Sequence, residues 1–438
     1  MRSTIETITA IATPPGKGGV GVIRISGPAA LSIAENISGQ KPKARHAVYA
    51  RFYDHQKSVI DTGLLLYFIG PNSFTGEDVI ELQGHGGPVI QDLLLKEVIC
   101  LGARQARAGE FSERAFLNDK IDLAQAEAIA DLIDSSTAQA AKGAMRSLQG
   151  EFSEKIKNLL KELIYLRMYV EAAIDFPEEE IDFLADEKIR TSIENLQNSL
   201  VTTIAQASQG AILRYGLRLV IAGKPNAGKS SLLNALAGHD AAIVTNIPGT
   251  TRDTISETID IDGLPVHIID TAGLRDSEDE VEKIGIQRAR KAMEEADHVL
   301  LLVDASNHTP NEPFENPEKT TLIYNKIDLV PDPQKLEGIK ISATNTQGID
   351  ALREYVKGLA GYSQENETVF TARRRHITAL EEGRDAVQRG LSQLRLHNAG
   401  ELLADELLQA QNQLNQITGE FSADDLLGEI FSGFCIGK

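Results

Sequence analysis

Cysteine is scarce in this chain, and no long hydrophobic run occurs in it. The 438 residues include two cysteines, Cys100 and Cys435, and neither has a partner at metal-ligand spacing. This usage excludes a disulfide framework and fits a reducing compartment. No segment approaches the roughly 18 consecutive apolar residues of a membrane span, and the N-terminus has no signal-type apolar core. We expect a cytoplasmic protein that makes no contact with a membrane.

Basic residues are also fewer than acidic ones, with 44 lysines and arginines against 63 aspartates and glutamates. The net charge of −19 repels polyanions at long range, which argues against broad nonspecific binding of nucleic acid. Local basic patches remain compatible with this balance. With 42% apolar and 24% charged residues the composition is that of a folded protein, and the length predicts two to three domains.

The pattern of apolar residues changes three times along the chain. Residues 1–118 mix short apolar runs with turn residues, whereas residues 121–213 are rich in Ala, Leu, Glu and Gln at helical spacing. Strand-like runs then alternate with helix patterns over 217–359, which is typical of a parallel α/β sheet. After Arg373–Arg375, which we interpret as a solvated hinge rather than an RNA site, the chain is helical again. The predicted fold is multidomain α/β: an α+β domain at 1–118, a helical domain built from 119–214 and 374–438, and an inserted P-loop domain at 215–373.

One glycine-rich segment imitates a nucleotide motif. Gly16–Gly21 spells G-x-G-x-x-G, but the pyrophosphate-binding version must open a helix. Here it runs into Val20–Ile25, which has the pattern of a strand. We therefore reject a dinucleotide site in this segment.

A second glycine-rich segment has the required context. Gly223–Ser230 follows the apolar strand pattern Leu217–Ala222 and opens a helix pattern at Ser231. Its glycines allow backbone N–H groups to wrap phosphates at a helix N-terminus. Lys229 would reach the β- and γ-phosphates, and the Ser230 hydroxyl would ligate magnesium.

Further motifs follow the later strands in the order expected of a GTPase. Asp270–Gly273 places a carboxylate beside the magnesium, and Thr251 occupies the position of the switch threonine that ligates it. Asn325–Asp328 resembles the guanine-reading element, in which Asp328 accepts from the N1–H and the exocyclic amine of guanine. Ser342-Ala343 resembles the loop whose backbone N–H meets guanine O6. Together these elements predict binding of magnesium-GTP.

The means of hydrolysis is less clear from the residues. Leu274 stands where Ras-type enzymes carry the glutamine that orients the attacking water, and leucine has no group for this task. Asn226 lies where some GTPases use an asparagine to help hold potassium against the phosphates, although it could simply brace the loop. Arg252 and Arg275 are the competing sources of positive charge.

Long strings outside the GTPase motifs carry a resemblance over almost the whole chain. They are Thr13–Gly16, Ser73–Asp78, Gly84–Gly87, Gly109–Phe111, Arg114–Asn118, Asp122–Glu127 and Phe434–Lys438. With them, the chain resembles the MnmE (TrmE) family of tRNA-modification GTPases, within the TrmE-Era-EngA-EngB-Septin-like superfamily. The resemblance implies an N-terminal domain that binds tetrahydrofolate and dimerises the protein, a helical domain from two segments, and an inserted Ras-like GTPase domain.

The resemblance also implies site residues. Arg24, Glu81, Lys120 and Lys438 match positions that contact 5-formyl- or 5,10-methylene-tetrahydrofolate, although from the residues alone each is an ordinary surface charge. Cys435 would lie near the modification centre, and a buried, inert thiol is the ordinary alternative.

In the GTPase domain, the resemblance implies that Glu282 fixes the catalytic water. Lys229 and Thr251 are the other implied catalytic residues. Magnesium would be held by Ser230 and Thr251, and potassium by Asn226, Thr245, Ile247 and Thr250. The implied nucleotide-binding set is Asn226, Ala227, Gly228, Lys229, Ser230, Ser231, Thr245, Asn246, Ile247, Pro248, Gly249, Thr250, Thr251, Asp270, Thr271, Ala272, Gly273, Asn325, Lys326, Asp328, Ser342 and Ala343.

The implied reaction needs partners. A homodimer of the chain would work with the flavoprotein MnmG, which supplies FAD, to install an aminomethyl or carboxymethylaminomethyl group at C5 of the wobble uridine of certain tRNAs. The alternative is an Era-like GTPase that times ribosome assembly. Such a protein would need a basic RNA-binding appendage, and the sequence contains no segment of that kind.

Overall fold

The computed structural model describes residues 6–175, 187–238, 256–270, 293–307, 317–333, 336, 338–362, 370–397, 399–420 and 424–437. Its contacts divide the chain into two compact units, one of Met1–Ala130 with Gln411–Lys438 and the other of Asp131–Ala410. Within the described ranges, no helix is long and apolar enough to cross a membrane.

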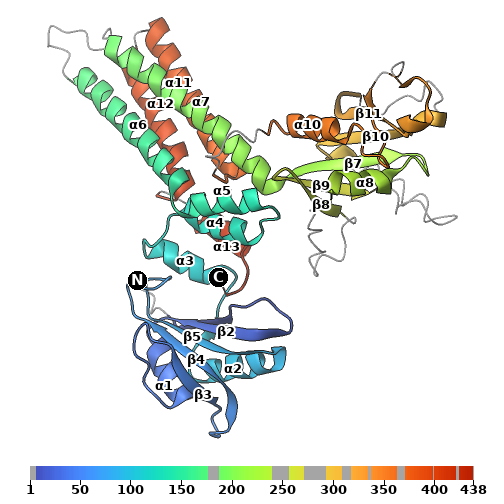
Figure 1. Cartoon of the computed structure of the whole chain (residues 1–438). Coiled ribbons are helices and arrows are strands. Elements are labelled where there is room, and N and C mark those ends of the chain that lie inside the picture. The colour runs from blue at the N-terminus through green and yellow to red at the C-terminus, as the bar shows by residue number, and fades with distance from the viewer. Residues whose placement is uncertain are drawn as a thin grey trace, which may run out of the picture. The chain divides into compact units, whose positions relative to one another are not determined.

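The first unit is built on a six-stranded sheet in the order β3-β4-β5-β2-β1-β6 (Figure 1). Its strands are β1 (Ile8–Ile11), β2 (Gly18–Ser26), β3 (Val48–Tyr53), β4 (Val59–Phe68), β5 (Val79–Gly86) and β6 (Arg104–Gln105). The imitation nucleotide motif therefore runs into β2, as predicted. Because side chains alternate along a strand, Ile23 and Ile25 enter the core while Arg24 points to the other face.

Two helices cover the apolar face of this sheet. They are α1 (Ala30–Ser38) and α2 (Pro88–Cys100), and both contribute to one core with alternate residues of β2, β3, β4 and β5. The opposite face keeps polar side chains, among them Arg24 and Glu81, which are register partners in β2 and β5. The other helices of the unit are α3 (Glu110–Leu117), the start of α4 (Leu123–Ile133), the end of α12 (Gly400–Thr418) and α13 (Asp424–Ser432).

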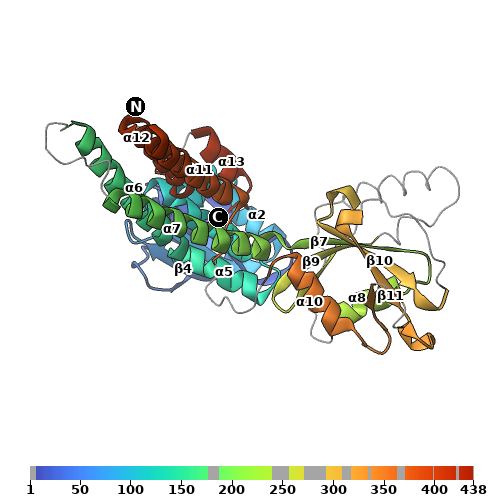
Figure 2. The ribbon, with the colours of Figure 1, turned by 90° about the horizontal axis from the view of Figure 1, so that it is seen from above.

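Helices form much of the beginning and the end of the second unit in the sequence. They are α5 (Ala138–Leu148), α6 (Glu151–Asp175), α7 (Glu187–Tyr215) and α11 (Arg374–His397), and α7 packs against the other three. Figure 2 shows α6, α7 and α11 running side by side. Leu159, Leu163, Leu166 and Val170 of α6 recur at helical spacing and are all buried. The helical pattern predicted on both sides of the α/β segment is thus confirmed.

Between these helices the chain forms a second six-stranded sheet, in the order β12-β11-β10-β7-β9-β8. Its strands are β7 (Leu217–Gly223), β8 (Ser256–Ile261), β9 (Leu264–Asp270), β10 (His298–Asp304), β11 (Thr320–Asn325) and β12 (Ile339–Lys340). All neighbouring pairs are parallel except β8 with β9. The helices α8 (Lys229–Ala237) and α10 (Ile349–Leu359) complete its main core, and short 3-10 turns occur at Ala305–Asn307, Pro317–Lys319 and Ile327–Leu329. In such a sheet the carboxyl ends of β7, β9, β10 and β11 meet at one edge, which is where open α/β sheets bind ligands.

Candidate functional site

The phosphate-loop segment connects β7 to α8 at this edge. Gly223, Asn226 and Gly228 all have positive φ, so the backbone turns back on itself before α8 begins at Lys229. A Cβ on Gly228 would collide with the side-chain amide of Asn325, which explains why glycine is needed there. The Lys229 ammonium donates to the carbonyl oxygens of Gly223 (3.0 Å) and Lys224 (3.3 Å), inside the loop. The loop therefore has the geometry of a phosphate cradle at a helix N-terminus.

Asn325 joins this loop to the segments predicted to read the base. It ends β11 and is 3% exposed. Its Nδ2 donates to the Ala227 carbonyl at 2.8 Å, and its Oδ1 accepts from the Ala343 N–H at 3.0 Å. Ser342 is buried beside it, whereas Asp328 is exposed. The structure thus brings the phosphate loop, the Asn325–Asp328 segment and the Ser342-Ala343 loop together through one buried amide.

Three predicted ligands of the metals and the phosphates have defined places. The Ser230 side chain is exposed in the first turn of α8, and that of Asn226 is exposed on the loop. The backbone of Asp270 ends β9 opposite Ile221 of β7, at the same sheet edge. The other predicted residues lie outside the described residues: Thr245, Asn246, Ile247, Pro248, Gly249, Thr250, Thr251, Thr271, Ala272, Gly273 and Glu282, together with Leu274, Arg252 and Arg275.

One residue of this edge is not among those predicted from the sequence. Asp304 is the last residue of β10, and its Oδ2 lies 2.6 Å from the Lys326 Nζ. The available signal was its position, because an acidic residue directly follows an apolar strand there, as Asp270 does in β9.

In the first unit the structure brings together two of the residues predicted to bind folate, Arg24 and Glu81. Arg24 donates through Nε (3.1 Å) and Nη2 (3.0 Å) to Glu81 Oε1, and through Nη1 to the Gly437 carbonyl (3.2 Å). Its guanidinium also lies 5.8 Å from the centroid of the Phe111 ring. Lys120 donates instead to the Pro71 carbonyl at 2.9 Å. Lys438 lies outside the described residues.

The C-terminal cysteine is accessible. Cys435 is exposed, so the interpretation of its thiol as buried is wrong. The chain next to it is nevertheless held in place, because Ile436 pairs with Ala108 in an antiparallel bridge and the Gly109 N–H donates to the Cys435 carbonyl at 3.4 Å. A fixed backbone therefore presents an exposed thiol.

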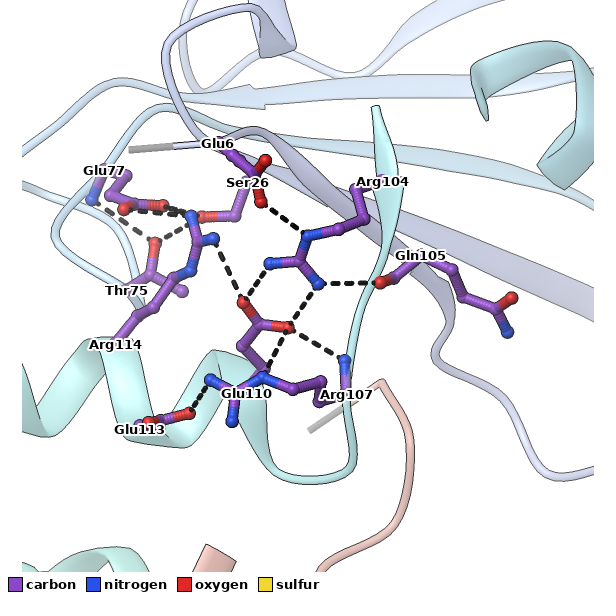
Figure 3. Close-up of polar contacts among 10 residues, drawn as sticks. All are labelled: Glu6, Ser26, Thr75, Glu77, Arg104, Gln105, Arg107, Glu110, Glu113 and Arg114. Atoms are coloured by element: carbon purple, nitrogen blue, oxygen red, sulfur yellow. Dashed lines mark hydrogen bonds and ion pairs between the residues drawn. The ribbon is translucent and has the colours of Figure 1, made fainter. Parts of the chain in front are cut away.

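A buried carboxylate, Glu110, organises the residues around α3 (Figure 3). It accepts from Arg104 at 2.7 and 3.1 Å, from the Arg107 N–H at 2.8 Å and from Arg114 at 3.2 Å. Burial alone would raise the pKa of Glu110, but the hydrogen bonds from Arg104 and the Arg107 N–H outweigh it and lower the pKa from 4.5 to about 2. Arg114 also pairs with Glu77 at 3.0 Å, which ties α3 to the loop before β5.

Another carboxylate gathers segments of the second unit. Asp131, near the end of α4, is 7% exposed. Its Oδ1 accepts from Arg214 Nε at 2.5 Å and from Arg373 Nη2 at 2.8 Å. The interpretation of Arg373–Arg375 as a solvated hinge is therefore wrong for Arg373, because a buried acid from a distant segment pairs with it.

Comparisons with known proteins cover both units. Residues 7–120 match the family model described as GTP-binding protein TrmE N-terminus, and residues 123–435 match the model of the MnmE helical domain. A relative from Pseudomonas fluorescens (strain Pf0-1), described as tRNA modification GTPase MnmE, is 58% identical over 100% of both chains. A relative from Chromohalobacter salexigens with the same description is 57% identical over 99% of this chain and 98% of its own. Among solved structures, the G domain of the T. maritima FeoB iron transporter is 28% identical, covers 33% of this chain and 98% of its own, and has a TM-score of 0.25.

Proposed function

The chain belongs to the MnmE family, and from this membership we propose that it hydrolyses GTP to drive modification of the wobble uridine in tRNA. It is a GTP hydrolase that acts in tRNA modification, as its full-length relatives are described. We propose that it acts in the cytoplasm. The match of residues 7–120 to a TrmE N-terminus disfavours the Era-like alternative, which has no use for that domain.

One observation carries the nucleotide-binding part of this proposal. The amide of Asn325 bonds both the phosphate loop, through Ala227, and the base loop, through Ala343. A nucleotide that lies across the edge would have its phosphates against the N-terminus of α8 and its base against Asp328. An exposed carboxylate there accepts from the two adjacent donors of guanine, which adenine does not offer.

The chain's own residues account for binding of the triphosphate. Backbone N–H groups of the loop and the Lys229 ammonium would bind the β- and γ-phosphates. The exposed Ser230 hydroxyl fits a magnesium ligand, with Thr251 as the other, and Asp270 ends β9 at the same edge. Magnesium neutralises charge that develops on the phosphates when it is bound.

Hydrolysis needs a further cation and an oriented water. Because Leu274 cannot orient water, we assign that task to Glu282 and assign the cation site to Asn226, Thr245, Ile247 and Thr250. The exposed side chain of Asn226 leaves its amide oxygen open to potassium, which supplies positive charge beside the phosphates. Two GTPase domains of a homodimer would pair across their nucleotides to complete the site.

The cation and the glutamate can be tested separately. GTP hydrolysis by the full chain should be far faster in potassium than in sodium buffer, and equal rates would transfer the role to Arg252 or Arg275. Glu282→Ala should retain GTP binding and lose turnover, whereas the control Glu257→Ala, an exposed glutamate of β8, should keep both. Full turnover by Glu282→Ala would remove that residue from the mechanism.

We assign one-carbon donation to the first unit. Arg24 and Glu81, with Lys120 and Lys438, would hold 5-formyl- or 5,10-methylene-tetrahydrofolate, since arginine and lysine suit its carboxylates and glutamate suits its pterin. The Arg24–Glu81 pair is partly exposed, at 24% and 16% of the two side chains, and is therefore within reach of a ligand. Arg24→Ala should abolish binding of 5-formyl-tetrahydrofolate, measured by calorimetry. Arg51→Ala, an exposed arginine in β3 of the same sheet, should leave it intact.

The complete reaction would require the flavoprotein MnmG with its FAD, in a complex with the homodimer. The product would be an aminomethyl or carboxymethylaminomethyl group at C5 of U34. Nucleoside analysis of tRNA from a deletion strain tests this role. An unchanged wobble uridine would refute it, even if the chain hydrolyses GTP.

A further inference from the structure

Asp304 lies beside the base-reading segment but belongs to another strand. In the parallel pairing of β10 with β11 it is the register partner of Asn325. Its Oδ2 accepts from the Lys326 Nζ at 2.6 Å, and the two side chains are 20% and 32% exposed. A short, charge-assisted hydrogen bond in a partly buried place is one of the stronger polar contacts that a protein makes.

The carboxylate of Asp304 is itself fixed. Its Oδ1 accepts from the Ser306 N–H at 3.0 Å and from the Ser306 hydroxyl at 2.6 Å. Burial would raise the pKa of Asp304, but the hydrogen bonds from Lys326 and Ser306 outweigh it and lower the pKa. Asp304 is therefore ionised at neutral pH and held in a single orientation.

Lys326 has an unfavourable backbone conformation. Its φ of 63° and ψ of 36° are left-handed, a conformation that is unfavourable for a residue with a side chain. This conformation turns the chain sharply between the buried Asn325 and the exposed Asp328. The contact between Asp304 and the lysine side chain helps offset that cost, so it stabilises the turn that sets the direction of both neighbours.

We propose that Asp304 is a positioning residue for guanine recognition and acts through Lys326. This rests on the proposed function, in which Asn325–Asp328 reads the base. Asp304 makes no contact with the nucleotide in this proposal. It fixes the lysine and its turn, so that the Asn325 amide stays on its two partners and the Asp328 carboxylate meets the base without first being ordered.

Asp304 should affect the affinity for the nucleotide but not the rate of GTP hydrolysis. Removing Asp304 should raise the Kd for GDP about tenfold, the size expected when one charge-assisted hydrogen bond is lost. The kcat at saturating GTP should stay within about twofold, since the residue is at the base end of the site and the reacting phosphate is at the other. Discrimination between GDP and IDP should fall too. Inosine lacks the amine that Asp328 would bind, so the wild type should bind GDP more tightly than IDP. Without Asp304 the Asp328 carboxylate is not ordered for this contact, and the ratio of the Kd for IDP to the Kd for GDP should approach one.

The experiment uses the full chain, with Asp304→Ala as the main variant. Asp304→Asn, which keeps an oxygen for the Ser306 N–H but loses the charge, serves if the alanine variant fails to fold. The control is Asp297→Asn, next to the opposite end of β10, where the carboxylate accepts from the Arg218 N–H at 2.8 Å. The control removes a carboxylate adjacent to the same strand and should change neither the Kd for GDP nor the IDP-to-GDP ratio.

A double-mutant cycle shows whether the effect passes through the lysine. In a Lys326→Ala background, Asp304→Ala should have no further effect on the Kd for GDP. Independent effects that multiply would overturn the proposal, as would a Kd and an IDP-to-GDP ratio unchanged by Asp304→Ala. If the wild-type chain bound ADP as well as GDP, the proposed function would fail first. If the wild-type chain prefers GDP to ADP but Asp304→Ala changes neither the Kd for GDP nor the IDP-to-GDP ratio, this inference alone is refuted.

Discussion

Replacing the buried carboxylate of Glu110 by an amide, as Glu110→Gln, should destabilise the first unit by about 3 kcal/mol at pH 7. The pKa of Glu110 is lowered from 4.5 to about 2, which corresponds to roughly 3 kcal/mol of favourable interaction of the ionised form. The side chain is 4% exposed, so water screens this interaction little. Glutamine has nearly the same shape, and the loss is therefore one of charge: the Arg104 and Arg114 cations stay beside a neutral amide, which keeps one acceptor oxygen and replaces the other with an N–H donor.

The dependence on pH has a definite sign. Because the pKa is lower in the folded than in the unfolded chain, the stabilisation is complete above about pH 4.5 and is lost as the pH falls towards 2. The difference in free energy of unfolding between the wild type and Glu110→Gln should shrink over that same range. Urea unfolding followed by far-ultraviolet circular dichroism gives this difference at each pH.

Hydrogen exchange of the full chain provides a local measurement at pH 7. Amides of α3 should exchange about a hundredfold faster in Glu110→Gln, the factor that corresponds to roughly 3 kcal/mol. Glu113→Gln is the matched control, because it lies in the same helix but pairs with an arginine that is 65% exposed. Its effect should stay below about 1 kcal/mol. Equal exchange in the two variants, or a difference in stability that persists at pH 2, would refute the reasoning.

Three further predictions concern the other sites. Asn325→Ala leaves two buried backbone partners unpaired and should raise the Kd for GDP about 30-fold, which is the equivalent of two hydrogen bonds of about 1 kcal/mol each. An unchanged Kd in a fluorescence titration would contradict the bridging role of Asn325. Asp131→Asn should lower the free energy of unfolding of the second unit by about 3 kcal/mol, measured by urea titration, since it breaks a buried ion pair; wild-type stability would contradict this. Cys435 should be alkylated by iodoacetamide in the native chain, as should Cys100; protection of either thiol in peptide mass spectra would contradict its exposure.

The sequence predicted the parts of the site that are encoded locally. The phosphate loop needs glycines at fixed spacing between a strand and a helix, and both strand and helix are found at β7 and α8. Asn325 could be placed because it follows an apolar strand of a parallel sheet, whose carboxyl ends meet at one edge. Spacing and strand order were sufficient for these residues.

Other contacts depend on which distant segments meet, and no local pattern reveals that. Asp131 and Arg373 are 242 positions apart, so the arginine run looked like a solvated hinge. The pairing of Asp304 with Lys326 depends on the β10–β11 register, which a single sequence does not specify. The exposure of Cys435 likewise follows from how the C-terminal segment pairs with Ala108.

Glu110, Asp131 and Asp304 share one feature, a carboxylate paired with a cationic side chain. The consequence of losing it depends on where in the structure the carboxylate lies. Each carboxylate is largely buried and accepts a hydrogen bond from a cationic side chain of another element, so loss of its negative charge weakens a charge-assisted contact in a poorly solvated place. At Glu110 and Asp131 the donors join elements of the fold, and the cost should appear as stability. At Asp304 the donor is part of the turn proposed to read guanine, and the cost should appear in nucleotide affinity. The same substitution to an amide, made at all three positions, therefore distinguishes a carboxylate that holds the fold from one that orders a binding site.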